Sequence, residues 1–103
     1  MIKRKSRATV ETLVGITNAQ KKRLDSIKQD MRAASNGRFK ARITDALDQV
    51  FRQADRPHSI ANLDKAFVAG SVALLASDGV DVQEAIRFRE TLERAVMIAR
   101  GLE

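Results

Sequence analysis

Hydrophobic residues recur with two different periods along the chain, first at every second position and then at every third or fourth. Residues 8–16 alternate, and β-branched side chains dominate one of the two faces. That inward face consists of Val10, Thr12, Val14 and Ile16. Because Gly15 and repeated threonines lower helix propensity, the segment is predicted to be a β-strand. The alternative is a helical stripe that continues into the next segment and makes residues 8–35 one long helix.

Two helices are predicted between this strand and the single proline. Thr17 or Asn18 caps the first helix by accepting hydrogen bonds from its free backbone amides. That helix ends at Asn36 and Gly37, because glycine adopts the left-handed conformation of a helix C-terminus at little cost. Its apolar face comprises Leu24, Ile27, Met31 and Ala34. The second helix has a stripe broad enough for the centre of a core, made of Phe39, Ile43, Ala46, Leu47, Val50, Phe51 and Ala54.

A hairpin of two further helices is predicted after Pro57. The proline disfavours helix in the residue before it, and Ser59 is placed to cap a third helix. Asp81 with Glu84 is a capping-box-like start for a fourth. The inward residues of the third helix are Ile60, Leu63, Phe67, Gly70 and Leu74. Those of the fourth helix are Val82, Ala85, Ile86, Leu92, Val96 and Ala99.

The predicted fold is therefore mainly α, with one N-terminal strand. Residues 1–7 form a flexible basic arm, and residues 8–56 form a domain of one strand and two helices. Residues 57–103 form a C-terminal two-helix hairpin.

Charge also divides the chain near Pro57. Residues 1–58 carry 14 Lys or Arg against 6 Asp or Glu, whereas residues 59–103 carry 5 against 7, within a formal net charge of +6. Such a concentration of cations suits a polyanionic partner, because each Lys or Arg that meets a phosphate releases condensed counterions. A solvated basic surface without a ligand is the alternative interpretation.

Residues that carry chemistry are sparse. The chain contains no cysteine, which excludes disulfides and thiolate metal sites and suits a cytoplasmic protein. The only histidine, His58, lies in the hinge and is predicted to be a turn residue. The aspartate pairs in the two halves lack further metal ligands. We therefore expect no enzymatic activity, no metal and no cofactor. No apolar stretch has the length of a membrane span, so no membrane partner is expected.

The order of strand, helix, glycine-containing turn and helix over residues 8–54 resembles the ribbon-helix-helix family of DNA-binding dimers. Residues 12–17 are similar to the family's alternating strand, and residues 38–51 to its second helix. The resemblance implies that strands from two chains pair antiparallel and lie in the major groove. It implies an intertwined homodimer with a core of Val10, Thr12, Val14, Ile16, Ile43, Leu47, Val50 and Phe51.

The resemblance also implies which residues meet DNA. The outward strand face would contact bases, the basic arm would contact phosphates, and backbone amides around Gly37 would hold a phosphate at the start of the second helix. The outward face departs from the family pattern, since Glu11, Leu13 and Gly15 replace the usual polar side chains. The expected DNA-binding set is Lys3, Arg4, Lys5, Arg7, Thr9, Glu11, Leu13, Gly15, Gly37, Arg38, Phe39 and Lys40.

These features predict a cytoplasmic, sequence-specific protein that binds double-stranded DNA as a homodimer. It would act as a transcriptional repressor, or as an accessory factor in plasmid or phage DNA maintenance or transfer. Residues 59–103 would support higher assembly or bind a protein partner. Two alternatives stay open: an all-helical interaction module whose basic face binds an acidic protein, and an antitoxin of a toxin-antitoxin pair.

Overall fold

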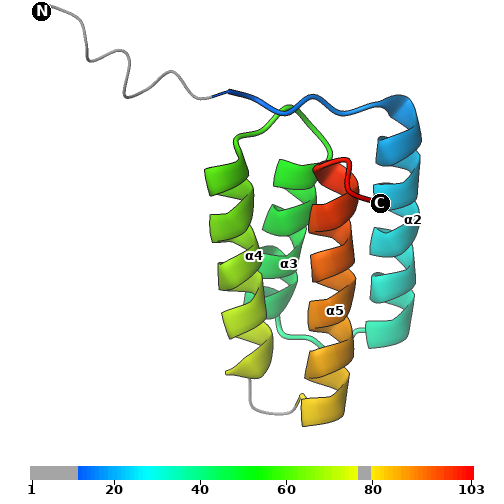
Figure 1. The fold of residues 1–103 in the computed structure, drawn as a ribbon. Helices are drawn as coiled ribbons and strands as arrows, with labels where there is room; N and C mark the ends of the chain where they lie inside the picture. The colour runs from blue at the N-terminus through cyan, green and yellow to red at the C-terminus, as the bar shows by residue number, and fades with distance from the viewer. Residues whose placement is uncertain (1–11, 77–79) are drawn as a thin grey trace, which may run out of the picture.

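In the part of the chain that the structure describes, four helices run alternately up and down (Figure 1). The structure is a computed structural model and describes residues 12–76 and 80–103. The helices are α2 (Asn18–Ser35), α3 (Ala41–Ala54), α4 (Ile60–Leu75) and α5 (Val82–Ala99). None of the described helices is both long and apolar enough to span a membrane.

The helix ends follow from local capping chemistry. Thr17 forms a capping box with Gln20: the Thr17 hydroxyl accepts from the Gln20 amide at 3.1 Å, and the Gln20 side chain accepts from the Thr17 amide at 2.7 Å. Asn36 and Gly37 end α2 with φ of 48° and 73°. The side chain of Asp81 caps α5 by accepting from two backbone amides. These caps and the Asn-Gly stop agree with the sequence-based predictions. The capping box expected of Asp81 and Glu84 is formed only in part, because the Glu84 side chain pairs with Arg38.

All four described helices contribute side chains to one hydrophobic core. Residues before and after Pro57 therefore belong to the same core. Fully buried side chains from each helix meet in it, among them Leu24, Val50, Leu63 and Leu92. Gly70 brings α4 close to its neighbours. A β-carbon there would lie 3.2 Å from both the Val50 and Leu92 side chains.

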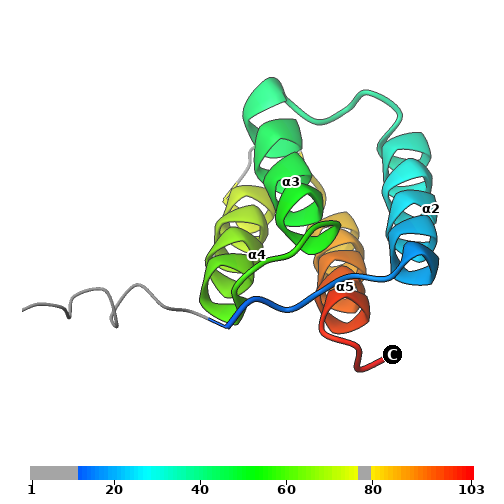
Figure 2. The same cartoon turned by 90° about the horizontal axis from the view of Figure 1, so that it is seen from above.

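α2 stands at one edge of the bundle. It packs mainly against α5 and has little contact with α3, and Figure 2 shows the space between the α2 and α3 ribbons. The Gln20 side-chain amide donates to the Ile98 carbonyl at 2.8 Å and ties the start of α2 to the end of α5. Most of the α2 circumference therefore faces solvent.

The predicted ribbon-helix-helix fold is wrong. Residues 12–17 are extended, but within the described residues they form no strand; Val14 makes a single isolated bridge with His58 of the same chain. The two backbone hydrogen bonds of this bridge measure 2.7 and 3.2 Å. Residues 8–11 of the predicted strand lie outside the described residues. The segment crosses one end of the bundle instead of pairing as a ribbon (Figures 1 and 2). The continuous helix over 8–35 is not formed either, because α2 begins at Asn18.

The periodicity also misplaced some positions on the helices. Ala34, predicted to be inward, is exposed on α2. Ile60, Val82 and Ile86 were likewise predicted to be inward and are exposed. The second helix begins at Ala41, so Phe39 belongs to the preceding loop.

Candidate nucleic-acid interface

The exposed face of α2 carries mostly polar side chains. Four residues at i, i+4, i+7 and i+11 share its solvent-facing side, and all four are exposed. We call this set the outer stripe: Lys22, Ser26, Gln29 and Ala33. It contains one cation, two neutral hydrogen-bonding groups, one methyl group and no carboxylate.

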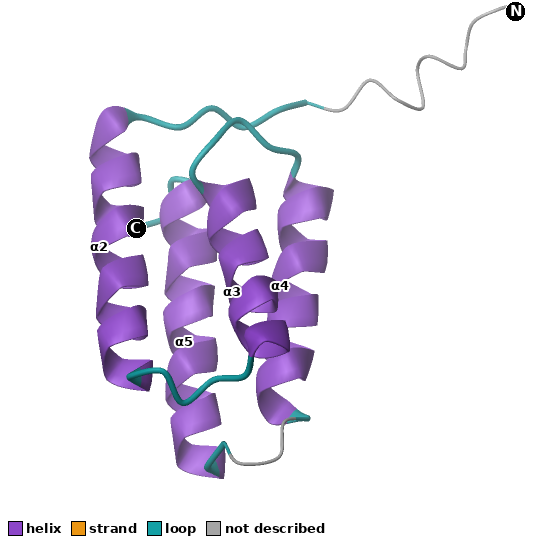
Figure 3. Ribbon diagram, turned by 180° about the vertical axis from the view of Figure 1, so that it is seen from behind, coloured by secondary structure: helices purple, strands orange, loops and turns teal. Residues whose placement is uncertain are grey.

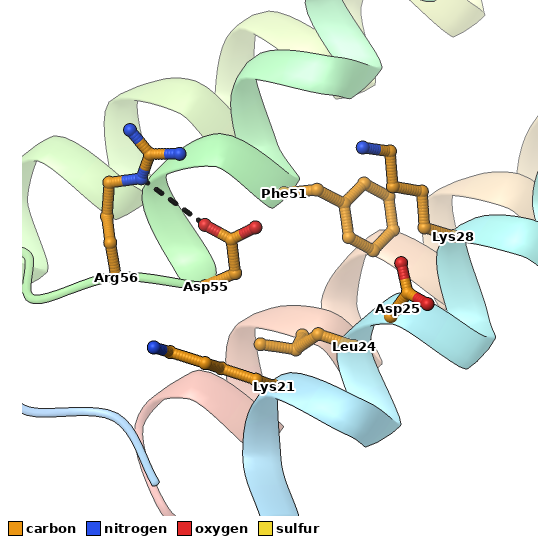
Figure 4. A pocket seen from close by; sticks show the side chains of 7 residues that line it. All are labelled: Lys21, Leu24, Asp25, Lys28, Phe51, Asp55 and Arg56. Atoms are coloured by element: carbon orange, nitrogen blue, oxygen red, sulfur yellow. Dashed lines mark hydrogen bonds and ion pairs between the residues drawn. The ribbon is translucent and has the colours of Figure 1, made fainter. Parts of the chain in front are cut away.

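A cleft between α2 and α3 flanks the outer stripe on one side. It has a volume of about 500 Å³. Figure 4 shows Leu24 and Phe51 between the two helices, with charged side chains around them. Those charged residues are Lys21, Asp25, Lys28, Asp55 and Arg56.

The charges in this α2–α3 cleft are only partly paired. The guanidinium of Arg56 lies 3.3 Å from the Asp55 carboxylate (Figure 4). Lys21 and Lys28 make no ion pair with any residue in the described part of the chain. Their ammonium groups are therefore available to an external anion along this flank of α2.

A second cleft, of about 440 Å³, separates the other flank of α2 from α5. Asp30 lines it, as do Arg87 and Arg94. Arg94 and Arg23 both contact the carboxylate of Glu103, at 2.7 and 2.8 Å. The cations on this flank are thus more fully neutralised than those facing α3.

Arg38 connects the end of α2 to α5. Its guanidinium donates to the carbonyls of Ala34 at 2.7 Å and Ser35 at 2.9 Å, and it forms an ion pair with the buried carboxylate of Glu84. This one side chain satisfies carbonyls at the end of α2 and connects them to the first turn of α5. The exposed carbonyl end of α2 is thereby joined to the core.

The loop before α3 contains the residues whose backbone amides were expected to hold a phosphate, and one of these amides is engaged in the fold. The Arg38 amide donates to the Ser35 carbonyl at 2.9 Å, so it is already engaged. Phe39 is half-buried, and its ring meets Phe88 edge-on with centroids 5.0 Å apart. Lys40 is the N-cap of α3 but makes no side-chain capping bond, while Gly37 lies in the turn after α2.

The remaining predicted site residues are spread over different environments. Thr12, Leu13 and Gly15 are exposed on the extended segment, and Val14 and Ile16 are half-buried. The predicted dimer-core residues on α3 pack inside the single-chain core, namely Ile43, Leu47, Val50 and Phe51. Seven predicted residues lie outside the described part of the chain: Lys3, Arg4, Lys5, Arg7, Thr9, Val10 and Glu11.

His58 is a buried structural residue and not an exposed turn residue. Its Nδ1 lies 2.7 Å from the Arg56 carbonyl, and its backbone pairs with Val14. Residues 12–76 and 80–103 contain no group of three or more His, Cys, Asp or Glu side chains placed to hold a metal ion.

The sequence analysis missed the outer stripe because it assigned DNA contact to the predicted strand, the basic arm and the start of the second helix. The signal was nevertheless present. Positions opposite the buried Leu24 and Ile27 carry no acid, whereas Asp25 and Asp30 fall on the two flanks.

No protein family, no curated protein and no solved structure matches the chain.

Proposed function

We propose that the protein binds double-stranded DNA by placing α2 in the major groove, with the outer stripe facing the base edges. An α-helix with its side chains is about 10–12 Å across, which matches a major groove about 12 Å wide. α2 has 18 residues and lies at the edge of the bundle. It therefore has the length and the exposure to enter a groove while α3, α4 and α5 stay outside.

The side chains of the outer stripe suit base edges. Lysine donates to guanine O6 and N7, glutamine pairs with the N6 and N7 edge of adenine, and serine hydrogen-bonds with several bases. The outer stripe supplies these three side chains at Lys22, Ser26 and Gln29. Ala33 adds a methyl group that can contact the methyl group of thymine.

Phosphate contacts come from the cations beside the stripe. Lys21 and Lys28 face the α2–α3 cleft without an ion-pair partner among the described residues. In the sequence, four further cations precede α2: Lys3, Arg4, Lys5 and Arg7. They extend the positive charge along the chain that leads into α2.

The observation that carries the proposal is the placement of acids on α2. Its two carboxylates, Asp25 and Asp30, line the two clefts, and none lies on the outer stripe. A merely solvated helix commonly carries acids on its outer face, because charge of both signs keeps that face soluble. The outer stripe therefore turns no carboxylate toward the base edges.

Binding of this kind supports regulation of a promoter, or an accessory role in plasmid or phage DNA maintenance or transfer. Both roles depend on occupancy of a DNA site, so both are subject to the same binding test.

Fluorescence anisotropy with a labelled duplex tests the proposal. The Lys21→Gln/Lys22→Gln/Lys28→Gln variant should bind more weakly, because it loses the base contact of Lys22. Its salt slope should fall by about 2, because the phosphate contacts of Lys21 and Lys28 are lost. The matched control, Arg52→Gln/Lys65→Gln/Arg89→Gln, removes the same charge from α3, α4 and α5, and Arg89 lies over the ring of Phe67 on α4.

The control should bind more tightly than the α2 variant. An equal loss of duplex affinity in the two variants would contradict the role of α2 and would indicate attraction by net charge alone. No binding to duplex at low salt would overturn the proposal and favour the acidic-protein alternative.

A further inference from the structure

The chain turns back toward α2 after the end of α5. Gly101 follows α5 with a φ of 75°, a left-handed conformation that glycine adopts at little cost. Its amide donates to the Ile98 carbonyl at 3.1 Å, and the Leu102 amide donates to the Met97 carbonyl at 2.9 Å. Figures 1 and 3 show this turn directing the chain toward α2. The turn places Glu103 beside both helices.

The Glu103 carboxylate is held by one arginine from each of these two helices. Its Oε1 atom accepts from Nη2 of Arg23 on α2 at 2.8 Å and from Nε of Arg94 on α5 at 2.7 Å. Nη1 of Arg23 also donates to the main-chain oxygen of Glu103 at 3.1 Å. Guanidinium groups bind phosphate with the same fork of donors that binds carboxylate. The two arginines therefore form an anion site, and Glu103 occupies it.

This anion site lies on the flank of α2 opposite the unpaired lysines. Arg23 is seven residues before Asp30 and eleven before Ala34, so it shares with them the flank of α2 that faces α5. Lys21 and Lys28 lie on the flank that faces α3, and the outer stripe lies between the two flanks. A helix in the major groove has a phosphate backbone on each side, so both flanks of α2 meet phosphates.

We propose that Arg23 and Arg94 form a binding site for a DNA backbone phosphate, and that Glu103 occupies this site in the free protein. The inference rests on the proposed function, because the outer stripe has to face the base edges. A phosphate of the duplex displaces the Glu103 carboxylate and takes over its contacts with both guanidinium groups. DNA is then held on both flanks of α2, and Glu103 lowers the affinity by competing for one of them.

The exchange is feasible because these ion pairs are open to water. The side chains of Arg23 and Arg94 are 43% and 58% exposed, and that of Glu103 is 28% exposed. Solvent-exposed ion pairs contribute little to stability, since water screens the charges. A backbone phosphate has a negative charge and free acceptor oxygens, so it replaces the carboxylate in kind. Each arginine that meets a phosphate also releases condensed counterions from the DNA, which favours the exchange at low salt.

Fluorescence anisotropy with the full chain and a labelled duplex tests the site. Glu103→Gln should bind about three- to tenfold more tightly than the wild type, and its salt slope should rise by about 1 to 2, because Glu103 no longer competes for two phosphate contacts. Glu93→Gln is the matched control, since it removes the same charge from an exposed position of α5. It should raise the affinity by less than about twofold, because its effect is limited to the screened net charge.

Removal of both arginines separates the site from net charge. Arg23→Gln/Arg94→Gln should cost more affinity in the Glu103→Gln background than in the wild-type background, because only the wild type holds the two arginines in ion pairs. It should also cancel most of the gain from Glu103→Gln. Arg52→Gln/Lys65→Gln removes the same charge from α3 and α4 and should cost the same in both backgrounds. Far-UV circular dichroism should report an unchanged helix content for all variants.

Inorganic phosphate provides a readout that does not depend on DNA. In NMR spectra of Glu103→Gln, phosphate should shift the side-chain Nε–H signals of Arg23 and Arg94 at lower concentrations than in the wild type. The signal of Arg52 on α3 is the control and should move least. Phosphate-induced shifts at the two arginines, together with no binding of duplex, would refute the role in DNA binding and retain the anion site.

A Glu103→Gln variant that binds duplex no more tightly than Glu93→Gln would overturn the proposal. So would a gain in affinity that survives the loss of both arginines, or phosphate shifts no larger at Arg23 and Arg94 than at Arg52. Each of these results leaves the measurement on Lys21, Lys22 and Lys28 unaffected, so the proposed function is judged separately.

Discussion

Replacing Arg38 with alanine should destabilise the bundle without weakening DNA binding. The guanidinium makes hydrogen bonds to the carbonyls of Ala34 and Ser35, at 2.7 and 2.9 Å, and an ion pair with Glu84. The Glu84 side chain is only 8% exposed, so Arg38→Ala leaves a buried carboxylate without its cation. The α2 carbonyls lose a donor at the same time.

The magnitude follows from the asymmetry of the pair. Removing one partner of a fully buried ion pair costs about 3–5 kcal/mol. The Arg38 side chain is 54% exposed, so solvent already screens part of the interaction. We therefore expect a loss of about 2–3 kcal/mol in the free energy of unfolding.

Urea unfolding followed by circular dichroism measures this loss. Arg87→Ala is the control, because Arg87 is exposed in the same α2–α5 cleft and makes no ion pair with any residue described by the structure. It should change stability by less than about 0.5 kcal/mol. Adding Glu84→Leu to Arg38→Ala should recover part of the loss, because no unpaired carboxylate remains.

The same variants separate a structural Arg38 from a phosphate-binding one. A structural role lowers stability and leaves the duplex affinity of the folded protein unchanged. A free energy of unfolding for Arg38→Ala within about 0.5 kcal/mol of the wild-type value is the change expected of an ordinary surface substitution. That result would refute the reasoning about the Glu84 pair.

Two further changes test the packing and the capping of the bundle. Gly70→Val adds side-chain atoms where even a β-carbon lies 3.2 Å from the Val50 and Leu92 side chains, so it should cost about 1–3 kcal/mol in urea unfolding. The exposed control Ala61→Val should cost much less, and equal losses would show that the close approach at Gly70 is unimportant. Thr17→Ala removes the hydroxyl that accepts from the Gln20 amide and should cost about 1 kcal/mol, seen as a lower thermal midpoint. Thr17→Ser should keep most of the stability; if serine fails as alanine does, the hydroxyl is not responsible.

Local signals in the sequence predicted the helix ends well. The caps at Thr17, Ser59 and Asp81 depend on side-chain-to-backbone hydrogen bonds within a few residues, and the stop at Asn36 depends on the left-handed backbone there. Such bonds require no knowledge of the rest of the fold. The main inward residues of each helix were predicted for a related reason, because a 3.6-residue period brings them to one face.

The N-terminal segment was mispredicted because alternation and β-branching describe an extended chain but not its pairing partner. Residues 12–17 are extended, with Val14 and Ile16 half-buried and Leu13 and Gly15 exposed. The predicted alternation therefore holds for residues 13–16, whereas Thr12 was expected inward and is exposed. The partner is the loop at His58 of the same chain, through one bridge, and a second strand is not found in the described residues.

Contacts between residues far apart in the sequence could not be predicted for a different reason. Nothing in the spacing of Arg38 and Glu84 indicates that they pair, because the packing of α2 against α5 brings them together. Periodicity also leaves the edges of a stripe undecided. Val82 and Ile86 fit the helical period of α5 but lie at its exposed edge.

Site-directed cleavage of DNA tests the placement of α2 in the major groove most directly. The chain has no cysteine, so Gln29→Cys gives a single attachment point for a DNA-cleaving chelate on the outer stripe. Asn62→Cys, exposed on α4, is the control. We predict cleavage of bound duplex from position 29, with the strand offset characteristic of the major groove, and little cleavage from position 62. Equal cleavage from both positions, or a minor-groove offset from position 29, would contradict the account.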